Sequence, residues 1–271
     1  MTSLSLSKSL SFLLLLILCS SPVLHADDPK EEVDDEHQFT YEEKSGKGPK
    51  RWGKLKAEWK VCNTGKLQSP IDLLHERVQV LPDLGKLKRD YKPAPAILKS
   101  RGHDIMVHWK GYAGQINING TYYKLLQCHW HSPSEHTINE KRFDLELHVV
   151  HQAHDGRVAV IGILYKLGRP DPLLSKLLPL IKSLGEEERD LGILNPGDIK
   201  FGSRKYYRYI GSLTIPPCTE GVTWTVVKKV RTASREQVRA LRDAVNDGFE
   251  ENSRPTQGLD GRPIWLYTKR P

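Results

Sequence analysis

Short runs in which apolar and polar residues alternate recur along the whole 271-residue chain. Alternation with a period of two is typical of β-strands, because successive strand side chains point to opposite faces. The clearest runs, separated by glycine and proline, cover residues 105–109, 115–118, 145–151, 158–165 and 222–227. The pattern predicts a mainly β domain.

Helical periodicity is confined to a few places, notably residues 173–184 and 234–246. Ser234 stands where an N-cap residue would, and Gln237 follows three residues later, which is the spacing of a capping box. We therefore expect short helices at the periphery of the β domain.

The N-terminus has the pattern of a secretory signal peptide. Lys8 precedes a short apolar run, residues 10–18, and small residues follow up to Ala26. The run is too short to span a membrane. We expect a signal peptide over residues 1–26, an acidic flexible arm over 27–38 and one domain over 39–271.

The chain carries a formal net charge of +8, and loss of Lys8 with the signal peptide would make it +7. The lysines and arginines are scattered along the sequence and are not grouped with interleaved aromatic residues, as they are in many nucleic-acid-binding proteins. We interpret them as solvated surface and expect no nucleic-acid partner. No hydrophobic anchor follows Trp265, so no membrane anchor is expected.

Three histidines have the spacing of a metal site built on two strands. His129 and His131 are two residues apart and so share a face of one strand, whereas Cys128 points to the other face; His148 lies in the next alternating run. Three histidines around Zn²⁺ leave one tetrahedral position open for water, as catalytic sites do. The pair alone is weak evidence, since close histidine pairs arise by chance. Gln127 and Glu146, each two residues before a histidine, strengthen the case as acceptors that orient ligand rings.

The segment 134–150 around these histidines, beginning Ser134-Glu135-His136-Thr137, resembles the α-class carbonic anhydrases at every defined position of their motif. Further similarities follow in the family's order, at residues 68–72, 101–104, 211–218, 222–224 and 252–255. The residues of these segments are most similar to those of the secreted plant branch of the family. The resemblance implies a central twisted, largely antiparallel sheet of about ten strands.

It also implies reversible hydration of carbon dioxide to bicarbonate by attack of zinc-bound hydroxide. The resemblance also implies that Thr214 accepts a hydrogen bond from the zinc-bound hydroxide while donating one to Glu135, and that His103 is the proton shuttle. Histidine suits that last role because its ordinary pKa is about 6.5.

The resemblance assigns an apolar wall for carbon dioxide to Val150, Val160, Leu213 and Trp224, although the same residues would suit a plain core. Ile215, in the same pocket, departs from the threonine usual there, and we expect modest changes in turnover and anion affinity. Arg101 departs from an asparagine of many animal relatives that helps hold the water chain toward the shuttle.

Three cysteines remain after loss of Cys19 with the signal peptide. By resemblance to secreted relatives, Cys62 pairs with Cys218 and braces the loop of Thr214. We expect Cys128 to be an inert buried thiol. Asn119, in the sequon Asn-Gly-Thr at an expected hairpin turn, is a candidate glycan acceptor.

Two other functions fit the same scaffold: a storage or defence protein with ascorbate-linked redox activity, and a non-catalytic binding module. Loss of a zinc ligand would have favoured either, and no ligand is lost. The signal peptide predicts the secretory pathway, leading to the apoplast or nectar, or to plastids through the endomembranes.

Overall fold

The computed structural model of the chain describes residues 38–246 and 248–268. The predicted signal peptide and all but the last residue of the predicted arm lie outside the described residues. None of the helices within these ranges is long and apolar enough to cross a bilayer.

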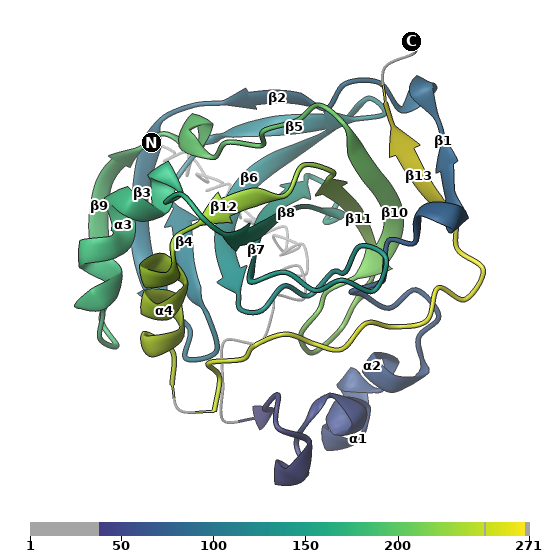
Figure 1. The fold of residues 1–271 in the computed structure, drawn as a ribbon, viewed down its shortest axis with the longest axis horizontal. Helices are drawn as coiled ribbons and strands as arrows, with labels where there is room; N and C mark the ends of the chain where they lie inside the picture. The colour runs from purple at the N-terminus through teal and green to yellow at the C-terminus, as the bar shows by residue number, and fades with distance from the viewer. Residues whose placement is uncertain (1–37, 247, 269–271) are drawn as a thin grey trace, which may run out of the picture.

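One sheet of thirteen strands dominates the structure and curls strongly on itself (Figure 1). Ten strands follow the order β1-β13-β10-β11-β8-β7-β6-β4-β3-β9, while β12 pairs with β8, and β5 pairs with β2 and β6. Most neighbours are antiparallel; β1 with β13, and β8 with β11 and β12, are parallel. The predicted mainly β fold with a largely antiparallel sheet is confirmed.

The strands are β1 (Val78–Val80), β2 (Lys88–Tyr91), β3 (Ala94–Ser100), β4 (Ile105–Trp109), β5 (Gly114–Ile118), β6 (Thr121–His131), β7 (Leu145–Ala153), β8 (Val158–Leu167), β9 (Arg189–Leu194), β10 (Tyr206–Ser212), β11 (Glu220–Val227), β12 (Arg231–Ala233) and β13 (Ile264–Tyr267). The α-helices are α1 (Trp52–Leu55), α2 (Val61–Thr64), α3 (Pro172–Lys182) and α4 (Arg235–Asp243). Short 3-10 turns cover Glu43–Ser45, Pro49–Arg51, Ala57–Trp59, His75–Arg77, Pro82–Leu84 and Pro196–Asp198.

Local sequence explains the ends of several elements. The β5–β6 hairpin turns at Asn119 and Gly120, which both have positive φ, as a two-residue type I′ turn requires. Helix α4 begins after Ser234, whose side chain and that of Gln237 form the predicted capping box. Helices α3 and α4 end two or three residues before their predicted ends, at Lys182 and Asp243.

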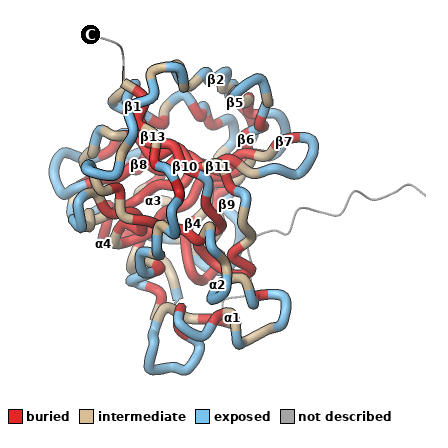
Figure 2. The backbone as a smooth tube through the Cα atoms, turned by 90° about the vertical axis from the view of Figure 1, so that its right-hand side faces the viewer, coloured by how far each residue is buried: buried red, intermediate tan, exposed pale blue. Residues whose placement is uncertain are grey.

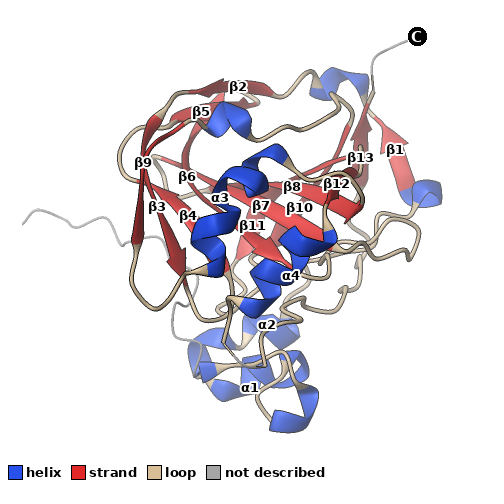
Figure 3. Ribbon diagram, turned by 60° about the vertical axis from the view of Figure 1, so that its left-hand side comes forward, coloured by secondary structure: helices blue, strands red, loops and turns tan. Residues whose placement is uncertain are grey.

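The sheet separates two apolar layers. Helices α3 and α4 cover one face (Figure 3), where Leu177 and Leu241 belong to the same buried cluster as Cys128 and Val149. Val150 and Trp224, on the opposite face, belong to a second cluster. Figure 2 shows the resulting concentration of buried backbone in the middle strands. Because both faces are packed, the central strands hold whatever side chains they carry in fixed positions.

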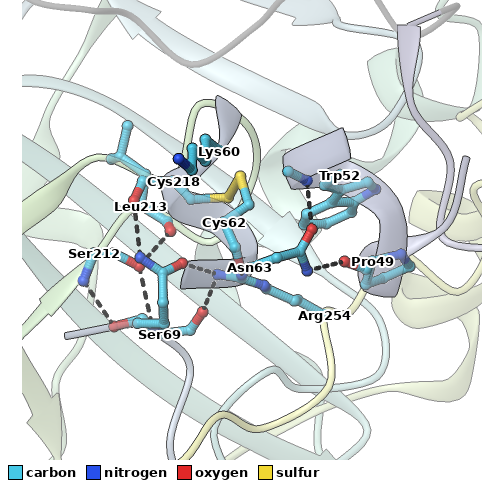
Figure 4. Close-up of a disulfide and its surroundings, with 12 residues drawn as sticks. Pro49, Trp52, Lys60, Cys62, Asn63, Ser69, Ser212, Leu213, Cys218 and Arg254 are labelled. Carbon is cyan, nitrogen blue, oxygen red and sulfur yellow. Dashed lines mark hydrogen bonds between the residues drawn. A yellow bond between two sulfur atoms is a disulfide. The ribbon is translucent and has the colours of Figure 1, made fainter. Parts of the chain in front are cut away.

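A disulfide joins the N-terminal helical segment to the loop between β10 and β11 (Figure 4). Cys62 and Cys218 are bonded across a sequence separation of 156 residues, as the resemblance implied. The guanidinium of Arg254 donates to the backbone oxygens of Cys62 and Ser69, at 2.6 and 2.7 Å. Cys128 is free and buried, and burial raises the pKa of its thiol, in agreement with an inert role.

Buried His151, on the helix-covered face of β7, gives the fold a dependence on pH. Its Nε2 lies 2.8 Å from the hydroxyl of Tyr91, and burial lowers its pKa to about 3 although the carbonyl of Ala159 acts in the opposite direction. An unfolded histidine has a pKa of about 6.5. The unfolded chain therefore binds more protons between these two values, and stability is lost as the pH falls through this window.

We predict that the free energy of unfolding falls by about 1.5 kcal/mol between pH 6.5 and pH 5 because of His151, at 1.36 kcal/mol per pKa unit. Urea unfolding of wild type and His151→Gln at both pH values measures the difference. His154→Gln, at an exposed position in the β7–β8 turn, is the control. An equal pH dependence of wild type and His151→Gln would contradict the prediction.

Candidate metal centre

Antiparallel pairing of β6 and β7 brings the three predicted histidines together. His129 stands opposite His148 in the register, and His131 stands opposite Glu146. Because His129 and His131 are two residues apart, both face the side of the sheet that His148 faces. One potential ligand atom from each ring lies within 4.8 Å of the other two. All three residues are buried.

Each ring is fixed by a hydrogen bond at one nitrogen. Gln127 Oε1 lies 2.9 Å from Nδ1 of His129, the backbone oxygen of Asn252 lies 2.7 Å from Nδ1 of His131, and Glu146 Oε1 lies 3.0 Å from Nε2 of His148. The other nitrogen of each ring is thus left for a metal. Gln127 and Glu146 occupy their predicted positions.

Sequence reasoning assigned no role to Asn252. Its contact with His131 is through a backbone carbonyl 121 residues away, and its side chain also accepts from the backbone nitrogen of Ser132 at 2.8 Å. A main-chain contact across such a separation leaves no residue-type signal in a single sequence.

Glu146 fixes the turn that follows β6 in addition to the ring of His148. Its Oε2 accepts from the backbone nitrogens of Glu135 and His136, at 2.9 and 2.8 Å, and its Oε1 lies 2.7 Å from Nδ1 of His136. Burial opposes ionisation, but His136 and His148 hold the pKa of Glu146 well below its usual range. His136, Glu146 and His148 also form a compact group of potential ligands, which these hydrogen bonds account for.

The electrostatics favour neutral imidazoles at two of the three positions. Burial lowers the pKa of His129 and His148, and neighbouring histidines lower both further. Burial would also lower the pKa of His131, but the Glu135 carboxylate and the hydrogen bond to Asn252 raise it overall. His131 is therefore the ring from which a binding metal has most need to displace a proton.

Two buried polar atoms at the centre have no hydrogen-bond partner in the described ranges. They are Nε2 of His131 and Oε2 of Glu135, which lie 3.7 Å apart. Such buried polar atoms are costly unless something satisfies them. Three imidazole nitrogens are the donor set of a catalytic zinc site, so the residues present fit Zn²⁺.

Glu135 reaches the centre, whereas its expected hydrogen bond from Thr214 is not formed, since Oε2 of Glu135 has no hydrogen-bond partner among the described residues. Oε1 of Glu135 accepts from the backbone nitrogen of Arg254 at 2.9 Å, which leaves Oε2 directed at the ligand rings. Thr214 is buried in the β10–β11 loop that the disulfide closes at Cys218. The bridge therefore restrains the loop that carries Thr214.

His103 lies in the turn between β3 and β4 and is buried beside Phe39, whose ring centroid is 5.5 Å away. Its Nε2 lies 3.7 Å from a carboxylate oxygen of Asp104. The neighbouring Arg101 uses its guanidinium on that same carboxylate, with Nε 2.8 Å from Oδ1. This pairing, with Arg101 outweighing the effect of burial, keeps the pKa of Asp104 below its usual range.

All four residues of the expected apolar wall lie together in the structure. Val150, Val160, Leu213 and Trp224 share one buried cluster. The ring of Trp224 packs edge-on against His148, with centroids 4.8 Å apart. Ile215 instead belongs to a cluster formed with aromatic residues of the N-terminal segment, Phe39 and Trp52 among them.

Comparison with known families agrees with this geometry: the family described as eukaryotic-type carbonic anhydrase matches residues 47–268. The chain belongs to this family. The resemblance inferred from the sequence is confirmed, and similar proteins of plants place the chain in the plant branch.

Alpha carbonic anhydrase 4 of Arabidopsis thaliana is 61% identical over 236 residues, which are 87% of this chain and 88% of that protein. Carbonic anhydrase Nec1 of Nesocodon mauritianus is 44% identical over 264 residues, covering 95% of this chain and 94% of the relative.

Two solved structures are also similar. Dioscorin complexed with ascorbate superposes with a TM-score of 0.84 at 43% identity, covering 86% of this chain and 98% of dioscorin. The α-carbonic anhydrase of Thermovibrio ammonificans with sulfanilamide gives a TM-score of 0.78 at 35% identity, covering 84% and 98%.

We predict that Gln127→Ala weakens zinc binding about 10- to 100-fold, because the ring of His129 loses the acceptor that orients it. Competition against a chromophoric chelator measures the affinity. Gln115→Ala, on β5 and outside the centre, is the matched control. Unchanged affinity of Gln127→Ala would show that the ring is held by packing alone.

Proposed function

We propose that this protein is a zinc enzyme that catalyses the reversible hydration of carbon dioxide to bicarbonate and a proton. The observation that carries the proposal is the convergence of three imidazoles, each hydrogen-bonded at one nitrogen and each with a potential ligand atom within 4.8 Å of those of the other two. Three protein ligands, in place of the four of a structural site, are typical of catalytic zinc.

Zn²⁺ at this position would lower the pKa of a bound water from 15.7 to about 7 and so supply hydroxide at neutral pH. His129, His131 and His148 would bind it as neutral ligands and leave its double charge undiminished. Gln127, Glu146 and the carbonyl of Asn252 keep the rings in the orientation for binding.

Glu135 and Thr214 are proposed to orient the nucleophile. A threonine hydroxyl that donates its hydrogen to the Glu135 carboxylate can only accept a hydrogen bond from a zinc-bound hydroxide. A hydroxide held in this way would direct a lone pair toward the substrate. The unpaired Oε2 of Glu135 is the acceptor that this arrangement needs. Val150, Val160, Leu213 and Trp224 are proposed to hold carbon dioxide against the centre, and Ile215 to alter anion affinity in place of a hydroxyl.

We also propose that the protein is exported and glycosylated. The Cys62–Cys218 disulfide supports an oxidising compartment such as the secretory pathway. Asn119 is exposed at the hairpin turn, where a glycan transferase can reach it. The apoplast or nectar remains the proposed destination, with plastids reached through the endomembranes as the alternative.

Zinc content and carbon dioxide hydration, measured together on the mature protein, test the activity. We expect one zinc per chain, activity inhibited by a sulfonamide, and loss of both zinc and activity in His131→Ala. Glu135→Gln should keep its zinc and lose roughly 100-fold or more in kcat, because an amide presents donors in addition to its acceptor.

Full zinc occupancy without hydration would contradict the proposed activity. Absence of zinc from the mature protein would contradict the metal site as well, and would direct attention to the storage or ascorbate-linked function. A Glu135→Gln variant as active as wild type would refute only the role given to Glu135.

His103 is proposed to carry the proton from the centre to solvent. We predict that His103→Ala lowers kcat about tenfold or more in weak buffer and much less in concentrated imidazole, which replaces the missing group. His154→Ala, which removes an exposed histidine elsewhere, should change neither value. An unchanged kcat of His103→Ala in weak buffer would exclude the shuttle role.

A further inference from the structure

Two adjoining surface depressions share no residue with the metal centre. One, of about 660 Å³, is bordered by β2, the 197–202 segment and Arg231. The other, of about 460 Å³, lies at the end of β8 and the turn between β11 and β12. Gly202 and Arg231 line both, so the two depressions form one continuous surface.

Cationic side chains that are far apart in the sequence gather on this surface. The lining includes Arg89, Lys166, Lys200, Lys228, Lys229 and Arg231. No aspartate or glutamate lines either depression. The lysines and arginines are scattered along the sequence, and we expected them to form only solvated surface. The fold brings these six together.

Little of this charge is neutralised by the protein. Arg231 lies 3.3 Å from a carboxylate oxygen of Asp171. The other five cations form no ion pair with any residue in the described ranges.

The acidic residues closest in sequence are engaged elsewhere. Asp198 pairs with Lys176 at 2.6 Å, and Asp90 lies 3.7 Å from Lys92. Asp90 also points to the opposite side of β2 from Arg89, because the two are adjacent in a strand. The lining of this surface therefore carries an excess of positive charge.

We propose that this surface, the basic surface of Arg89, Lys166, Lys200, Lys228, Lys229 and Arg231, binds an acidic polysaccharide whose sugars carry carboxylate or sulfate groups. Six cations spread over two depressions suit a chain with repeated anionic groups better than one small anion. Gly202, exposed at the junction, has no side chain to obstruct a polymer that passes from one depression to the other.

The aromatic residues of the lining argue against single-stranded nucleic acid, whose bases bind by stacking on exposed rings. Phe201 is only 7% exposed, and the guanidinium of Arg89 lies 3.7 Å from its ring centroid. The hydroxyl of Tyr91 is bonded to buried His151. Phe201 is thus nearly buried and the ring of Tyr91 is stacked on His151, with centroids 5.8 Å apart. Sugar hydroxyls and carboxylates need only the donors present.

The test compares two triple variants with the same loss of charge. Lys166→Gln/Lys200→Gln/Lys229→Gln removes exposed lysines from both depressions. Lys54→Gln/Lys60→Gln/Lys66→Gln removes exposed lysines around α1 and α2, at the end of the molecule opposite β2 (Figures 1 and 3). Calorimetric titration with oligogalacturonate and with heparin oligosaccharide separates carboxylate from sulfate recognition.

We expect at least one of these oligosaccharides to bind wild type, more weakly as salt is raised, and about tenfold or more weakly to the first triple variant at low salt. The second variant should lose less than about twofold by the same screening argument. Zinc content and thermal unfolding, which should be unchanged, establish that both variants fold.

Equal losses in the two variants would overturn the proposal, because the binding would then follow net charge alone. It would equally be overturned if single-stranded DNA of similar length bound as tightly as the oligosaccharides, or if inorganic phosphate displaced them at matched charge concentration. Since the readout is binding, failure here leaves the proposed hydration of carbon dioxide unaffected.

Discussion

The register between β6 and β7 is the constraint on which the rest of the site depends. It places His129 opposite His148 and His131 opposite Glu146, so that one pair of strands supplies all three imidazoles and one of their acceptors. A shift of one residue would send His148 to the helix-covered face and destroy the cluster. The packed layers on both faces of the sheet, one under α3 and α4, hold that register.

Glu146 transmits this constraint from the strands to the turn that follows β6. One carboxylate oxygen fixes His148 and His136, and the other holds the backbone at Glu135 and His136. The position of Glu135 is then completed by the backbone of Arg254, whose guanidinium also ties Cys62 and Ser69 together. A few buried charges thus connect the N-terminal segment, the metal centre and the C-terminal region.

Much of the site was predictable because its residues obey short-range rules. Alternation along β6 predicted the common face of His129 and His131, and the hairpin turn was expected at the sequon of Asn119. The third ligand, His148, was predicted from its place in the next alternating run, whereas the disulfide partner came from resemblance to a family. The role of the Asn252 carbonyl, the separate packing of Ile215 and the gathering of the basic surface depend on contacts between distant segments, which periodicity and composition do not encode.

The division of the sheet into two faces has an evolutionary consequence. Cys128, Leu147 and Val149, which alternate with the metal-site residues, belong to the core on the opposite face of the sheet from the three histidines. Replacement of one histidine by another residue that fits its space would remove metal binding while leaving that core intact. The same chain architecture can therefore drift away from metal chemistry by single substitutions and remain a folded protein available for other uses.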